Sequence, residues 1–199
     1  MSAILLVGLK ITDLSAWTAL ETGQRLLDPG HTLTRIAREQ LLFFEPEPGS
    51  KAGAFERVLG EAVRQTNFFV NPNKERYRFL TSTERGESWT PPDGAWGILS
   101  RVREDTRDEG LKARLLREHP MPGLGAIRRA KVWWLWSRGA DGTPATSYFR
   151  ATLGEIQDRR HGLLVNPHAE VAMLLQGATP WSRVEPFLIE PAPAFRAAA

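Results

Sequence analysis

The chain has 199 residues, of which 42% are hydrophobic and 25% charged, and its mean hydropathy is -0.32. This composition is typical of a folded protein and excludes wholesale disorder. Because the chain has no cysteine, disulfides, thiolate nucleophiles and sulfur-ligated metal sites are excluded. The four histidines also lack the i, i+4 spacing of paired ligands on one helical face, so we expect neither a metal nor a cofactor.

The charge distribution bears on possible partners. The pI is near 9.6, yet the formal net charge is only +3 and basic residues alternate with acidic ones, as on an ordinary solvated surface. No apolar run approaches the roughly 20 residues that span a bilayer, and residues 1–6 lack the basic start and cleavage site of a secretory signal. We therefore expect a cytoplasmic protein with no membrane partner.

The first half of the chain predicts five elements. Residues 4–11 are apolar enough for a strand, a helix follows over about 15–27, and residues 33–44 form a middle strand or a bent hairpin. A second, amphipathic helix is indicated by an i, i+3, i+4, i+7, i+8 stripe made of Phe55, Val58, Leu59, Ala62 and Val63. A last strand is expected at 77–80.

The second half repeats this order of elements. It predicts a strand over 96–102, a helix over about 108–119, a strand or hairpin over 126–136 and a last strand over 171–175. The stripe of the second helix recurs as Phe149, Thr152, Leu153 and Ile156, with Ser147 available as its N-cap.

Two Val-Asn-Pro-x-x-Glu segments mark the repeat most clearly. Leu59-Gly-Glu61 precedes Phe69-Val-Asn-Pro-Asn-Lys-Glu75, and Leu153-Gly-Glu155 precedes Leu164-Val-Asn-Pro-His-Ala-Glu170. Upstream of these segments, Arg35-Ile-Ala-Arg38 aligns with Arg128-Arg-Ala-Lys131. Because the matches follow one another in the same order, the sequence predicts a tandem duplication.

We expect an α+β fold of two tandem two-layer modules, each a small, mostly antiparallel sheet with two helices on one face and a ferredoxin-like character. The first module covers residues 1–81, a linker 82–93 and the second module 94–178, while the Pro/Ala-rich residues 179–199 form an extended tail. Adjacent tryptophans on a strand, such as those in Trp133-Trp134, point to opposite faces. We therefore expect the two sheets to pack through their helix-free faces, either within one chain or in a homodimer.

The repeat resembles PurS, the small subunit of bacterial and archaeal phosphoribosylformylglycinamidine synthase. That family typically shows Asp-Pro-x-Gly opening a helix, then Val-Arg-x-Gly-Lys-x-x-Glu-Leu, and later Leu-Leu-x-Asn-Pro-x-x-Glu-x-Tyr. The second half offers Asp108-Glu-Gly110, Ile127-Arg-Arg-Ala-Lys131 and Leu163-Leu-Val-Asn-Pro-His-Ala-Glu170, and the first half offers Phe69-Val-Asn-Pro-Asn-Lys-Glu-Arg-Tyr77. Ala37 and Ala130 stand where the family has glycine.

The resemblance implies a scaffolding subunit that bridges the ATP-dependent synthetase subunit and the glutaminase subunit of the complex in de novo purine biosynthesis. It assigns no residue to catalysis and no cofactor to the chain. The candidate partner-binding residues are Arg35, Arg38, Asn71, Arg128, Lys131 and Asn166. In the alternative structural interpretation, Asn-Pro starts a turn at a strand end, and the basic side chains of a half-buried strand point to solvent.

Two other functions stay open. An RNA-binding or RNA-processing protein with tandem ferredoxin-like modules, for which nucleic acid is the partner, is favoured by the pI and the aromatic strands. A small-molecule enzyme that uses the cleft between the two copies is the third possibility. Glutamine hydrolysis and ATP consumption by the isolated chain are not expected, because it has no cysteine nucleophile and no Gly-x-x-x-x-Gly-Lys phosphate loop.

Overall fold

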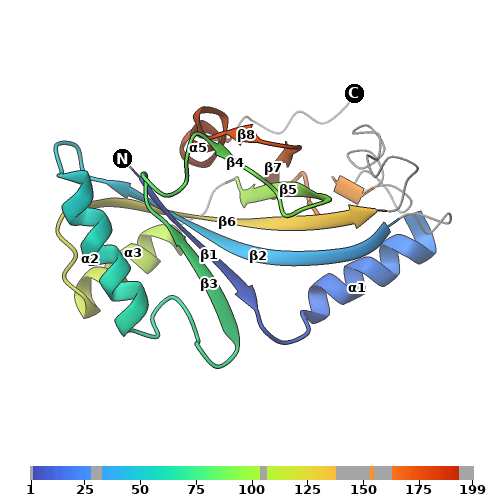
Figure 1. Cartoon of the computed structure of the whole chain (residues 1–199), viewed down its shortest axis with the longest axis horizontal. Helices are drawn as coiled ribbons and strands as arrows, with labels where there is room; N and C mark the ends of the chain where they lie inside the picture. Colours follow the sequence, from blue (N-terminus) through green and yellow to red (C-terminus); the bar gives the residue numbers. More distant parts are fainter. Residues whose placement is uncertain (1, 28–32, 104–106, 138–152, 155–162, 193–199) are drawn as a thin grey trace. The chain divides into compact units, whose positions relative to one another are not determined.

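The computed structural model describes residues 2–27, 33–103, 107–137, 153–154 and 163–192 (Figure 1). The fold is α+β, with a mostly antiparallel six-stranded sheet of order β3-β1-β2-β6-β5-β7 and a two-stranded sheet of β4 and β8. The elements are β1 (Ala3–Leu9), α1 (Leu14–Thr22), the π-helical turn η1 (Gly23–Leu27), β2 (Leu33–Pro46), α2 (Ala52–Gln65), β3 (Glu75–Leu80), β4 (Ser88–Trp89), β5 (Ala95–Val102), α3 (Arg107–Glu118), β6 (Leu124–Ser137), β7 (Glu170–Leu175), β8 (Thr179–Pro180) and α5 (Trp181–Ile189). None of the described helices is long and apolar enough to cross a membrane.

The chain divides into two compact units, each built from three segments. Unit 1 contains Met1–Ile11, Glu39–Glu87 and Asp105–Ala130, and unit 2 contains Thr12–Arg38, Ser88–Glu104 and Lys131–Ala199. The strands β2 and β6 have 14 residues each and belong partly to one unit and partly to the other. As a result α1, which follows β1 of unit 1, belongs to unit 2, whereas α3, which follows β5 of unit 2, belongs to unit 1. The sequence predicts modules at residues 1–81 and 94–178, which are continuous in the chain, whereas each compact unit combines three separate segments. The duplication with these module boundaries stays a prediction.

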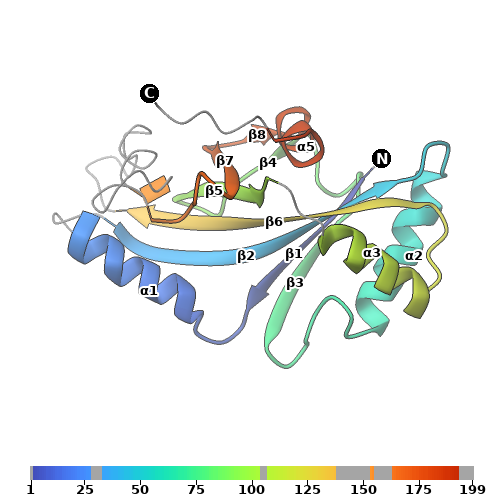
Figure 2. The same ribbon diagram turned by 180° about the vertical axis from the view of Figure 1, so that it is seen from behind.

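Unit 1 packs α2 and α3 on one face of its strands. The strand β1 pairs antiparallel with β2 on one side and β3 on the other, so that Val7 faces Gln40 and Tyr77. Figures 1 and 2 show α2 and α3 side by side, and both contribute to the same core cluster. The amphipathic stripe that predicts α2 supplies Phe55, Leu59 and Val63 to this core, alongside Phe44, Phe69, Leu115, Met121 and Ile127.

Unit 2 repeats the strand arrangement with different side chains. Here β5 pairs antiparallel with β6 and β7, and Ser100 faces Lys131 and Ala172 as Val7 faces its two neighbours in unit 1. The helix α1 packs with its small residues Ala16 and Ala19 in a core cluster that includes Ile98, Trp133 and Leu135. Small side chains on the helix leave room for the large indole of Trp133 in the same core.

The other face of the unit 2 strands carries a second aromatic cluster. Trp134 contacts Trp89 of β4 edge to face at a centroid distance of 5.6 Å, and Trp89 stacks on Trp181 of α5 at 5.3 Å. A Cβ atom at Gly97 would lie 2.6 Å from the Trp134 ring, so glycine is required there. The adjacent tryptophans therefore do point to opposite faces, as the alternation of side chains on a strand predicts.

The predicted helices at 15–27, 108–119 and around Phe55 are confirmed in type, as are all the predicted strands. Residues 33–44 and 126–136 lie in single long strands, β2 and β6, which resolves the choice between strand and hairpin. The helix predicted from the Phe149 stripe lies outside the described residues except for Leu153 and Gly154.

Two expectations from the sequence are wrong. The strands of one chain do not form two sheets packed through their helix-free faces, because β2 and β6 are neighbours in one sheet, whereas the homodimer through sheet faces stays a prediction. The segment after residue 178 is not an extended tail, because β8 and α5 occupy its first part. Three buried residues at i, i+3 and i+7, Trp181, Val184 and Leu188, stabilise α5 on the protein and outweigh the helix-breaking effect of Pro186.

Candidate functional site

An arginine and an aspartate meet at the start of one helix in each unit. In unit 2, Asp13 caps α1 by accepting hydrogen bonds from the backbone N–H groups of Ser15 and Ala16, and it also accepts from Arg38 Nε at 3.1 Å and Nη2 at 3.2 Å. In unit 1, Asp108 in the first turn of α3 accepts from Arg129 Nε at 2.7 Å. In both units the carboxylate therefore compensates the positive helix N-terminus and a strand arginine together.

These contacts correct the alignment of the two halves. The burial patterns of β2 and β6 match when Leu33 is placed on Leu124, and Arg38 then corresponds to Arg129. The sequence alignment of Arg38 with Lys131 is thus out of register. A motif of common basic residues cannot fix the register of a long strand, whereas the buried run that ends each strand can.

The two Val-Asn-Pro-x-x-Glu segments form the same turn. In unit 1, the Asn71 N–H donates to Glu75 Oε2 at 2.7 Å, and Asn71 Oδ1 accepts from the Asn73 N–H at 3.1 Å. In unit 2, the Asn166 N–H donates to Glu170 Oε2 at 3.2 Å, and Asn166 Oδ1 accepts from the His168 N–H at 3.1 Å. The motif is therefore a turn that satisfies its own polar groups before the last strand.

A basic residue at the end of the first strand of each unit holds this turn in place, which the sequence interpretation missed. Lys10 Nζ donates to the Pro72 carbonyl at 2.7 Å, and Arg103 Nε donates to the Pro167 carbonyl at 2.9 Å. The only sequence signal is a cation just after each first strand, and such a residue is common on any surface.

The remaining predicted residues also have partners within their own unit. Arg128 pairs with Glu45 at 2.8 Å, and Lys131 pairs with Glu170 at 2.7 Å. Arg35 is exposed and lies over the Trp136 ring at 4.4 Å. Of the six residues proposed to bind a partner, Arg35, Asn71 and Asn166 are exposed, and in the two asparagines the side-chain oxygen is used by the turn.

The described residues show no arrangement typical of catalysis. None of them form a cluster of histidines and carboxylates that could hold a metal ion. His119 has its ring 6.1 Å from that of Phe68, and His168 is exposed in the unit 2 turn. Two hydrogen bonds from Thr81 lower the pKa of Glu84, but this carboxylate lies in an exposed turn, where it fixes local structure.

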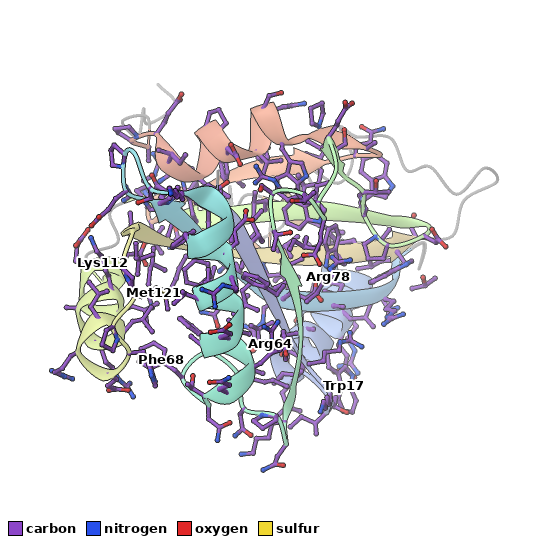
Figure 3. All side chains as sticks on the ribbon, turned by 60° about the vertical axis from the view of Figure 1, so that its left-hand side comes forward. Trp17, Arg64, Phe68, Arg78, Lys112 and Met121 are labelled. Atoms are coloured by element: carbon purple, nitrogen blue, oxygen red, sulfur yellow. The ribbon has the colours of Figure 1, made fainter. Side chains whose placement is uncertain are left out.

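Two exposed surfaces stand out instead. On α1, Leu14 is 69% exposed and Trp17 is 53% exposed, whereas the exposed residues of α3 are mostly charged or small. On β3, Arg76, Tyr77 and Arg78 are all exposed, and β3 lies at one edge of the six-stranded sheet. Figure 3 labels Trp17 and Arg78, which belong to these two surfaces.

Two comparisons with known proteins found no match. No protein-family model matches the chain, and no curated protein matches it at a significant level.

Proposed function

We propose that this chain is a non-catalytic assembly subunit, a tandem duplication of a PurS-like module that bridges the synthetase and glutaminase subunits of phosphoribosylformylglycinamidine synthase or a paralogous complex. The repeated turn supports this proposal, because the Asn-Pro-x-x-Glu motif shared with the family has the same hydrogen bonds in both units. The repeated strand pairing around β1 and β5 supports a duplicated module.

The exposed face of α1 carries the assembly part of the proposal. Leu14 and Trp17 lie one helical turn apart, so both side chains project from the same side of the helix. Soluble proteins seldom expose a large aromatic and a leucine together without using them, and tryptophan is enriched among the residues that dominate binding energy at interfaces. We therefore assign this face to the partner subunit.

The test is direct binding of the chain to separately purified synthetase and glutaminase subunits. Trp17→Ala should weaken binding by about 30-fold or more, the effect of losing an interface residue worth about 2 kcal/mol. Leu116→Ser on α3, another exposed leucine, is the matched control and should leave affinity within about twofold. Equal affinities of the parent and the Trp17 variant, or no binding of either subunit, would contradict the proposal.

The isolated chain should neither release ammonia from glutamine nor consume ATP. This expectation comes from the missing cysteine and phosphate loop. Ammonia release by the purified protein in the absence of the glutaminase subunit would show that the chain itself contains a glutaminase site.

One observation favours the alternative of an RNA-binding protein. The strand β3 exposes Arg76, Tyr77 and Arg78, a combination of cations and an aromatic ring that suits a single strand of nucleic acid. Three strand tryptophans, Trp96, Trp133 and Trp134, do not add to it, because their side chains are buried, with exposures of 5%, 6% and 2%. Oligonucleotide binding is therefore measured together with the peptide binding described next.

A further inference from the structure

We infer that the outer edge of β3 binds an extended acidic peptide segment of a partner protein, added as a further strand of the sheet. This inference rests on the proposed assembly function and names the chemistry of a partner. The strand β3 pairs only with β1 and ends the sheet, so its outward backbone N–H and C=O groups have no strand partner among the described residues. Such an edge is a template for strand addition.

Side chains on one face of β3 provide the charge specificity. Arg76 faces Gly8 and Arg78 faces Leu6 across the β1 ladder, so the two guanidinium groups lie on the same face two residues apart. Both arginines are exposed, and Arg78 has no ion-pair partner within the described part of the chain. A Cβ atom at Gly8 would lie 3.4 Å from Glu39 Oε1 and 3.5 Å from Arg76 Nε, so one carboxylate of the chain lies beside Arg76. Guanidinium groups in this position are suited to carboxylates at alternate positions of an added strand.

The opposite face of β3 is suited to apolar side chains at the intervening positions. Tyr77 is 43% exposed on this face, and its neighbour Phe79 packs against the unit 1 core. A Cβ atom at Gly60 of α2 would lie 3.3 Å from the Phe79 ring, so α2 covers Phe79 and Tyr77 is the ring left open on this face. The same Cβ would lie 3.4 Å from an Arg64 guanidinium nitrogen, so Arg64 is a third cation near the strand (Figure 3). An acidic-apolar-acidic segment therefore matches both faces of the edge.

The corresponding strand of unit 2 shows that the fold itself does not require these cations. In β7 the residues that correspond to Arg76 and Arg78, by their pairing with β5, are Val171 and Met173. The strand β7 is also an edge of the sheet, and it contains no basic residue. An edge strand of this sheet therefore forms without arginines, so Arg76 and Arg78 need a reason beyond the fold. Protection of the edge from aggregation is one such reason, and binding of a partner is another.

The inference is tested on the full chain, without any partner subunit, by binding of a peptide in which glutamate and valine strictly alternate. Both peptide termini are capped so that they carry no charge. At low ionic strength we expect measurable affinity, and Arg76→Gln or Arg78→Gln should each weaken it about tenfold, with added salt reducing the difference. Arg57→Gln removes the same charge from an exposed, ion-paired position of α2 and should change affinity less than twofold. The outward β3 amides should exchange more slowly with solvent when the peptide is bound.

Four results would overturn the inference. The first is absence of binding, and the second is an equal effect of Arg57→Gln. The third is equal binding of a peptide of the same composition with its glutamates in one block, which would show charge attraction without strand addition. Tighter binding of a single-stranded oligouridylate through the same arginines would replace the peptide with nucleic acid as the partner. If the chain binds this peptide but binds neither the synthetase nor the glutaminase subunit, the proposed function is refuted and this inference is not.

Discussion

The two units have the same strand arrangement and differ in how they bury it. In unit 1, one face of the strands is covered by α2 and α3 over a core rich in phenylalanine. Unit 2 buries tryptophans on both faces, with α1 on one side and Trp89 of β4 on the other, where Trp89 also stacks on Trp181 of α5. The two units therefore share their polar features, a helix-start aspartate and an Asn-Pro turn, although they differ in core packing.

Truncation of a buried aromatic side chain should have the largest effect on stability, and it should show whether the two units unfold separately. Trp134→Ala in unit 2 and Phe44→Ala in unit 1 each remove a fully buried ring and should cost about 3–5 kcal/mol in the free energy of unfolding. Hydrogen exchange should then rise first in β5 and β7 for the tryptophan variant and first in β1 and β3 for the phenylalanine variant. Equal loss of protection throughout both variants would mean that the units unfold as one.

The assignment of α1 to unit 2 is tested by Asp13→Ala. The substitution removes the cap of α1 and the ion pair with Arg38, and it should cost about 1–3 kcal/mol, since this pair is only partly buried. Although Asp13 follows β1 closely in sequence, the increase in hydrogen exchange should appear in β5 and in the second half of β6. Glu21→Ala, also on α1 but exposed, is the control and should change stability by less than about 0.5 kcal/mol. Faster exchange in β1 and β3 would contradict the assignment.

The equivalence of the two turns predicts equal costs for Asn71→Ala and Asn166→Ala. Each variant loses the side-chain hydrogen bond inside its turn and should lose about 0.5–1.5 kcal/mol in stability. Denaturant unfolding measures both values, with Asn73→Ala as a control that keeps the acceptor in place. A large difference between the two variants would show that one turn has a further role, such as binding a partner.

The smallest expected effect is at Ser100, which has Val7 as its counterpart in unit 1. The Ser100 hydroxyl is fully buried and has no hydrogen-bond partner among the described residues. Because an unsatisfied buried hydroxyl is unfavourable, Ser100→Ala should leave stability unchanged or raise it by up to about 1 kcal/mol. A loss of stability, measured by thermal unfolding, would indicate that the hydroxyl bonds to a bound water or ligand.

The site residues illustrate how far a motif can be interpreted without the fold. The sequence locates Asn71, Asn166 and the strand arginines, but it cannot show that Asp13 and Asp108 are their neighbours or that Lys10 and Arg103 hold the turns. These partners are distant in the chain, and each is a common residue type without a distinctive pattern. The exposed edge of β3 was not predicted either, because only the strand order shows that a strand has an open side.

The sequence by itself determined the α+β class, the types and order of the elements from β1 to β3 and from β5 to β7 among the described residues, and the Asn-Pro turns, but not β4, β8 and α5. These features depend on hydrophobic periodicity and on hydrogen bonds between residues that are close in the chain. Only the tertiary structure decided that α1 and α3 each belong to a different unit from the strand that precedes them in the chain. It also decided that β2 and β6 are neighbours in one sheet and that Trp181 of α5 stacks on Trp89. Long-range pairing depends on which buried surfaces fit together, and a periodic pattern contains no information about the partner that covers it.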